Sequence, residues 1–216
     1  MKSKERIHSW ECAVVALWLG VLSARGDHYV WQGGQEPVSP YTSWDNAASN
    51  IQEAIDQAAD GTTVWVRPGT YGRPPSPVVT SDVTNMVSIA RRITVRSVSD
   101  NPDDTIIDAG GEINNRCVRI DTSTSGALSP PFRISGFTLT NGYANGGGVW
   151  IEVNNNVRTA IVDRCVIVGN RGITSAGGVY NYYYGTSATL ILSNTVVRGN
   201  LNGGMYKGKH ARTIIT

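Results

Sequence analysis

The chain has 216 residues, 24 of them glycine, and a formal net charge of +2. This length suits one sizeable domain with its own hydrophobic core. Residues 1–26 hold four of the 19 basic and two of the 17 acidic residues, so 15 of each remain in residues 27–216. A formally neutral remainder lacks the basic field that attracts nucleic acid, and we exclude that class of partner.

The N-terminal 26 residues have the pattern of a secretory signal peptide. Basic residues precede an apolar run over residues 12–22, and Ala24 and Gly26 then form a small-x-small cleavage pattern. We expect cleavage before Asp27 and a secreted or cell-surface protein; a buried or peripheral N-terminal helix is the alternative. The run is shorter than the roughly 20 residues of a spanning helix, so we expect no transmembrane helix in the mature chain.

One amphipathic helix is predicted over residues 44–59. Its apolar residues recur at spacings of three and four, at Trp44, Ala48, Ile51, Ile55 and Ala58. Thr42 or Ser43 is the expected N-cap, and Asp60–Gly61 the stop signal. The sequence TTVWVR then predicts a strand that ends at a Pro-Gly turn.

Beyond this point the pattern changes to short strands separated by Gly, Asn, Asp and Pro. The predicted strands cover residues 92–98, 105–109, 116–121, 132–140, 147–153, 159–168, 177–183 and 188–198. The absence of a helical period between them excludes a doubly wound sheet. A sandwich, a barrel and a solenoid remain.

Internal repetition favours the solenoid. The segments ISGFTLTNG, VDRCVIVGN and LSNTVVRGN begin at Ile134, Val162 and Leu192, with offsets of 28 and 30 residues. Between them a Gly-Gly-aliphatic-aromatic motif recurs at residues 147–150, 177–180 and 203–206. The Gly pairs are expected at turns that need a positive φ, and the repeated Asn in a hydrogen-bonded ladder. The predicted fold is all-β: a right-handed parallel β-helix.

The same model assigns roles to the two ends of the chain. The amphipathic helix is expected to cap the first coil, whose unpaired strand edges would otherwise invite aggregation. The sequence stops partway through a coil. We therefore expect residues 27–216 to form a single β-helix domain that is incomplete at its C-terminus.

Two sets of residues resemble known β-helix proteins. The run NIQEAIDQAADGTTVWVRPGTY is similar to the N-terminal start of the pectin-lyase-like superfamily of right-handed β-helices. The segments TIIDAGG, RCVRI, ISGFTLTNG and GGGVW resemble exported bacterial repeat proteins similar to polymorphic outer membrane proteins. The resemblance implies a bacterial secreted, cell-surface or outer-membrane location. It does not choose between polysaccharide-cleaving enzymes and non-catalytic adhesins, which share this fold.

A search for catalytic groups assigns none. The adjacent pair Asp103–Asp104 lies in a turn-like string, away from any expected partner. Asp108, Asp121 and Asp163 are the Ca²⁺ ligand candidates if the chain resembles pectate lyases, and solvated strand residues otherwise. We expect no catalytic or metal-binding residue and no cofactor; Ca²⁺ enters only with the lyase alternative.

Aromatic residues are the candidate binding residues. Trp150, Tyr180 and Tyr206 occupy the same place in three successive Gly-Gly motifs, and Tyr182 shares their face. By alternation they should point outward and stack as a ladder. Such a ladder either stabilises the sheet or contacts sugar rings. The sequence alone leaves both roles open.

The resulting functional prediction is a secreted or cell-surface β-helix module, adhesin-like or structural, with polysaccharide or cell-surface glycan as its expected partner. The alternative is a polysaccharide lyase or glycosidase whose active-site coils follow residue 216. Cys117 and Cys165 lie in strand-like segments, where either a disulfide or two buried free thiols would fit.

Overall fold

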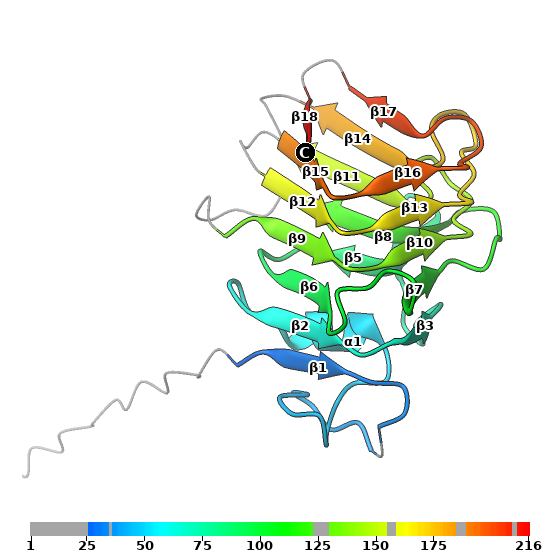
Figure 1. The fold of residues 1–216 in the computed structure, drawn as a ribbon. Helices are drawn as coiled ribbons and strands as arrows, with labels where there is room; N and C mark the ends of the chain where they lie inside the picture. The colour runs from blue at the N-terminus through cyan, green and yellow to red at the C-terminus, as the bar shows by residue number, and fades with distance from the viewer. Residues whose placement is uncertain (1–25, 35, 123–129, 155–158, 185–188, 209–210) are drawn as a thin grey trace, which may run out of the picture.

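The computed structural model describes residues 26–34, 36–122, 130–154, 159–184, 189–208 and 211–216, so residues 1–25 of the predicted signal peptide lie outside it. Figure 1 shows short strands stacked in successive coils that form a β-solenoid. Every strand pair is parallel except β4 with β5. The predicted all-β right-handed parallel β-helix with an N-terminal helix is confirmed.

The coils build three parallel stacks of strands. The first sheet has the order β1-β2-β6-β9-β12-β15-β18, with bounds His28–Val30, Thr63–Val66, Thr94–Ser97, Phe132–Ser135, Thr159–Asp163, Thr189–Ser193 and Arg212–Ile215. The second has the order β16-β13-β10-β7-β3, with bounds Val196–Arg198, Val166–Val168, Thr138–Thr140, Thr105–Asp108 and Gly69–Tyr71. The third has the order β17-β14-β11-β8-β5-β4, with bounds Met205–Lys207, Val179–Tyr184, Val149–Asn154, Asn115–Asp121, Val83–Ile89 and Val78–Thr80.

The strand register reproduces the repeat. Val162 pairs with Ile134 on one side and with Leu192 on the other, at the offsets of 28 and 30 residues. All three side chains are buried, and Phe137 packs with them in the same core. Matching inward positions of successive coils therefore stack into one continuous hydrophobic core.

The first two Gly pairs do not have the predicted role. Gly147, Gly148, Gly177 and Gly178 are absent from the positive-φ residues of the described chain, and only Gly203 of the third pair has a positive φ, of 111°. Left-handed turns instead recur at two other aligned sets, Gly136, Arg164 and Asn194, and Asn141, Gly169 and Gly199. Glycine is needed in the first two pairs because successive coils approach too closely there for a side chain: a Cβ on Gly148 would lie 2.7 Å from the carbonyl oxygen of Gly178.

The predicted asparagine ladder is present. Nδ2 of Asn170 donates to Oδ1 of Asn200 at 3.0 Å, and Oδ1 of Asn170 accepts from the backbone N–H of Gly142 at 2.8 Å. Nδ2 of Asn170 also donates to the Leu139 carbonyl. The buried Asn170 amide thus satisfies backbone groups at the turn of the preceding coil.

The helix is shorter than predicted. α1 spans Ile51–Gln57, and its N-cap is Asn50, whose side chain accepts from the backbone N–H of Glu53. Ser43 does not cap it, because its backbone N–H and hydroxyl donate to Asn46 instead. Ala48 forms a parallel bridge with Val30, so the segment before Asn50 extends the first sheet rather than the helix.

The helix nevertheless covers a strand edge, as predicted. The Gln52 amide accepts from the backbone N–H of Ser88 in β5 at 2.7 Å and donates to its carbonyl at 3.4 Å. The Gln52 side chain thereby makes the hydrogen bonds that a neighbouring strand would make with the edge of β5. β4 covers the start of β5 through a two-residue turn, Ser81–Asp82, in which both residues have positive φ, as in a type I′ hairpin. Within the described ranges, no helix is long and apolar enough to cross a membrane.

Both described cysteines are free and buried. Burial raises the pKa of the Cys117 thiol above its usual range and that of Cys165 to about 12. Thiols of an unfolded chain have a pKa of about 8.5. Above that pH the unfolded state therefore loses protons that the folded state keeps, and the free energy of unfolding should fall as the pH rises.

We accordingly expect native Cys117 and Cys165 to resist alkylation at pH 8 and to react at once in denaturant. Mass spectrometry of the two peptides measures the alkylated fraction of each. Rapid labelling of either thiol in the folded protein would contradict its burial.

Candidate functional site

The predicted aromatic ladder forms on the outer side of the third sheet. Trp150 pairs in register with Tyr180, and Tyr180 with Tyr206. The ring centroids of both pairs are 4.5 Å apart, with interplanar angles of 6° and 18°. Tyr182 lies 5.2 Å from Trp150 and is tilted by 32°. The structure thus brings the four candidate residues into one cluster.

The stacking has a consequence for binding. Tyr180 has Trp150 on one face and Tyr206 on the other, because β14 lies between β11 and β17. Its ring faces are therefore used within the ladder, and only its edge can meet a ligand. Tyr206, 42% exposed at the last coil, and the tilted Tyr182 retain ring surface outside the stack.

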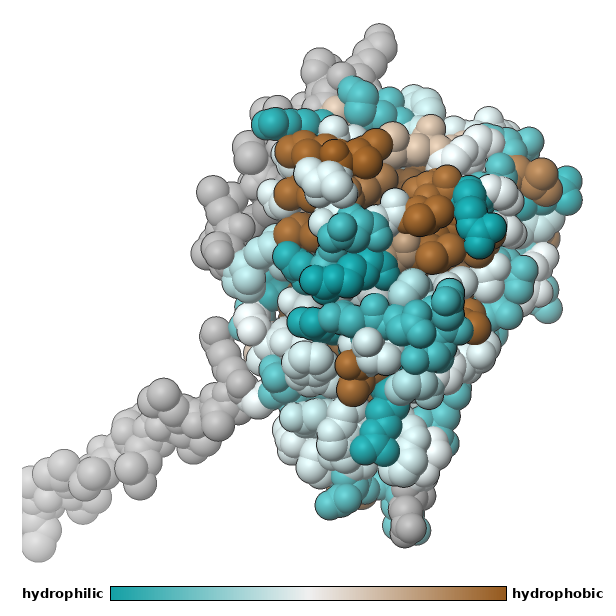
Figure 2. Space-filling model, viewed as in Figure 1, coloured by the Kyte–Doolittle hydropathy of each residue, from teal (hydrophilic) through white to brown (hydrophobic). Residues whose placement is uncertain are grey.

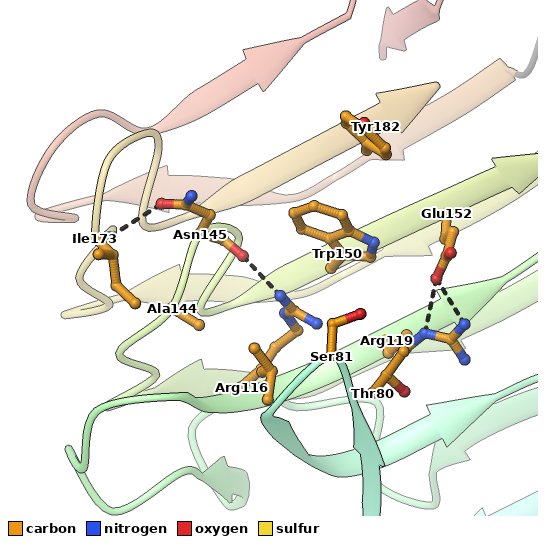
Figure 3. Close-up of a pocket in the computed structure, with 11 residues that line it drawn as sticks. Thr80, Ser81, Arg116, Arg119, Ala144, Asn145, Trp150, Glu152, Ile173 and Tyr182 are labelled. Carbon is orange, nitrogen blue, oxygen red and sulfur yellow. Dashed lines mark hydrogen bonds and ion pairs between the residues drawn. The ribbon is translucent and has the colours of Figure 1, made fainter. Parts of the chain in front are cut away.

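A pocket of about 440 Å³ opens beside the ladder (Figure 3). This volume falls within the usual range for ligand sites, about 300–1,000 Å³. The β4–β5 turn, strands β8, β11 and β14 and the loops after β10 and β13 supply its walls. The lining residues are Thr80, Ser81, Val83, Arg116, Arg119, Ala144, Asn145, Trp150, Glu152, Ile173 and Tyr182.

Arg116 lies on the pocket wall beneath Trp150, with its guanidinium carbon 4.7 Å from the centre of the indole ring. Arg116 comes from β8 and Tyr180 from β14, on opposite sides of β11, so the indole is held between them. Burial, followed by the positive charge of Arg119, lowers the pKa of Arg116 to about 9. The site therefore contains a desolvated cation against an aromatic ring.

A second arginine of the site forms ion pairs with two acidic residues. Arg119 donates to Glu152 at 2.6 Å and to Asp121 at 2.8 Å. Figure 3 shows the Arg119–Glu152 pair at the end of the pocket opposite Asn145. Both carboxylates are thus paired with Arg119. The Glu152 side chain is partly exposed and lines the pocket.

The loop that contains Asn145 forms another wall of the pocket. The Oδ1 atom of Asn145 accepts hydrogen bonds from the backbone N–H groups of Ile173, Thr174 and Ser175, all at 2.9–3.0 Å. One side chain therefore fixes the corresponding loop of the next coil. This pins the Ile173 side chain at the pocket.

Sequence reasoning identified Trp150 and Tyr182 but missed Arg116 and Ser81. Arg116 resembles any outward strand residue, and the segment with Ser81 carries no clear strand period. The available signal was the pair Ser81–Asp82 between two β-branched runs, which is compatible with a tight hairpin.

The three aspartates considered as Ca²⁺ ligands are not brought together. Asp108 lies on β7 in the second sheet, Asp121 on β8 in the third and Asp163 on β12 in the first. Asp163 is buried and paired with Arg133 and Arg164. In the described part of the chain, no group of three or more His, Cys, Asp or Glu could hold a metal ion.

Asp163 belongs to a different feature of the surface. It joins an ion-pair network across the first sheet that includes Arg96, Asp100, Arg133 and Arg164. Figure 2 shows a hydrophilic middle on this side of the molecule and apolar side chains over the C-terminal coils. Val196 and Ile215 are exposed on those coils. Each carboxylate of the network already contacts an arginine. We therefore assign the network a structural rather than a catalytic role.

Comparisons with protein-family models, curated proteins and solved structures found no match.

Proposed function

We propose that the protein is a secreted or cell-surface module of a bacterium that binds glycans through the outer side of its third sheet, without catalysing their cleavage. The observation that carries the proposal is the cluster of Trp150, Tyr180, Tyr182 and Tyr206 beside a pocket with polar walls. Sugars combine apolar C–H faces with many hydroxyls. Aromatic rings next to hydrogen-bonding side chains complement both properties.

The β-helix supports this role by repetition. Strands β11, β14 and β17 of three successive coils each place one outward aromatic residue in register with the next, so the contact surface extends along the axis of the solenoid. A polysaccharide also repeats along its length. The proposal includes an adhesin-like role and membership of the pectin-lyase-like superfamily. It is supported by the parallel β-helix and by the signal-peptide pattern of residues 1–26.

The non-catalytic part of the proposal is supported by the positions of the acidic residues. The lyase candidates Asp108, Asp121 and Asp163 belong to three different sheets. Glu152, which lines the pocket, is paired with Arg119, and so is Asp121. A pair of free carboxyl groups facing one bound sugar would be needed for glycoside hydrolysis.

The test is the double variant Trp150→Ala/Tyr180→Ala. This variant removes Trp150 from the pocket wall and also removes Tyr180, the ring that stacks on it. We expect retention on an immobilised polysaccharide to weaken at least about tenfold. Affinity electrophoresis measures the retention, and sugar-dependent tryptophan fluorescence reports on Trp150. Trp65→Ala, which removes an outward ring from the first sheet, is the matched control. Unchanged retention and fluorescence response in the double variant would remove the ladder from the proposal.

A further inference from the structure

The buried guanidinium of Arg116 is in no ion pair within the ranges that the structure describes. Only 5% of Arg116 is exposed, and no carboxylate among the described residues forms an ion pair with it. Glu152, the carboxylate whose charge acts on Arg116, is paired with Arg119, as is Asp121. A buried charge is costly unless it is paired, so this cation needs an explanation.

Three neutral oxygens accept hydrogen bonds from Arg116. Its Nε, Nη1 and Nη2 atoms donate to the Gly146 carbonyl, Asn85 Oδ1 and the Asn145 carbonyl, at 3.0–3.1 Å. An arginine side chain has five N–H groups. One N–H on each terminal nitrogen is therefore left without a protein acceptor in the part of the chain that the structure describes.

The three bonds also fix the orientation of the group. Asn85 is itself held by the Val78 and Val83 carbonyls of the β4–β5 hairpin. The indole of Trp150 covers the guanidinium from the other side. The two unused donors thus belong to a rigid group on the wall of the 440 Å³ pocket, which is the arrangement that favours tight recognition of an anion.

We propose that this pocket binds an acidic sugar, with the carboxylate or sulfate of the sugar as the missing partner of Arg116. The inference rests on the proposed glycan-binding function and specifies its ligand class. The sugar ring would meet Tyr182 and the edge of Trp150, and its hydroxyls would meet Ser81 and Glu152, which line the same pocket. Carboxylate and sulfate share the chemistry that a guanidinium recognises, and the experiment separates them.

The experiment is isothermal titration calorimetry of the full chain with four probes: methyl glucuronide, its neutral twin methyl glucoside, methyl glucoside 6-sulfate and inorganic sulfate. We expect at least one acidic sugar to bind about 30-fold or more tightly than the glucoside, because the loss of one partner of a buried charge pair has an effect of at least that size. The tighter of the two acidic probes identifies the anionic group.

Three variants locate the binding. Arg116→Met should reduce the affinity for the acidic sugar to that for the glucoside. Ser81→Asp places a carboxylate in the pocket, and Asp tolerates the positive φ of 48° at this position, so it should block acidic sugars while leaving the fold intact. Arg171→Met is the matched control, because Arg171 stacks on Tyr143 in the same manner outside the pocket.

The outcomes separate this inference from the function on which it rests. Equal binding of acidic and neutral sugars, or unchanged affinity in a folded Arg116→Met and in Ser81→Asp, would overturn the acidic-sugar inference and leave glycan binding intact. Binding of inorganic sulfate alone would overturn the sugar assignment and the proposed function together. Absence of binding by all three anionic probes would overturn the anion site itself.

Discussion

Gly148→Ala should unfold the solenoid at far lower denaturant concentration than the wild type. An added Cβ would lie 2.5 Å from Cγ2 of Ile167 and 2.7 Å from the carbonyl oxygen of Gly178 in the next coil. The backbone contact cannot relax without separating two hydrogen-bonded coils. We expect the free energy of unfolding to fall by at least about 3 kcal/mol, measured by urea denaturation followed by circular dichroism.

Gly72→Ala is the control for this substitution. Its backbone also lacks a positive φ, and an added Cβ would meet nothing closer than the Asp108 carbonyl oxygen at 3.6 Å. There the loss of unfolded-state entropy should leave stability unchanged or raise it by about 0.4–1 kcal/mol. Equal stabilities of the two variants would contradict the close approach of coils at the Gly-Gly motif.

Asn170→Ala should also lower the free energy of unfolding by a large amount. Truncation leaves the Gly142 N–H and the Leu139 carbonyl without their side-chain partner inside the solenoid. Each unsatisfied buried group has a penalty of about 1–3 kcal/mol, so we expect a total loss of about 3 kcal/mol in the free energy of unfolding. Thermal and urea unfolding measure it.

Asn200→Ala provides the graded comparison. Asn200 has the same place in the next coil, where its side chain donates to the Ile167 carbonyl at 2.9 Å, but it is only partly buried. Water can therefore replace part of what is lost, and the effect should be smaller. A larger effect for Asn200→Ala than for Asn170→Ala would contradict the dependence of the ladder on burial.

The features that repeat were predictable from the sequence. Residues at equivalent positions of successive coils have the same neighbours, so the alignment of Ile134, Val162 and Leu192 predicts their register directly. The aromatic ladder was predictable in the same way, since Trp150 and Tyr180 differ in position by one coil. Repetition converts a one-dimensional pattern into spatial contacts.

The features that occur once were not predictable. The role of Gln52 depends on the free edge of β5, and the helix start depends on the bridge between Ala48 and Val30. The pocket depends on the hairpin at Ser81, whose two positive-φ residues carry no glycine signal. The first two Gly pairs are required by close packing rather than by a positive φ, whereas Gly203 in the third pair does have a positive φ. A sequence does not distinguish conformational freedom from close packing.

The measurement that tests the central claim most directly is a screen of the full chain against plant and algal polysaccharides, with and without Ca²⁺. It follows retention, reducing ends and the absorbance of unsaturated products together. The proposed function predicts retention of at least one polysaccharide without Ca²⁺, and no cleavage. Cleavage would contradict a non-catalytic module, and absence of retention across the panel would contradict glycan binding.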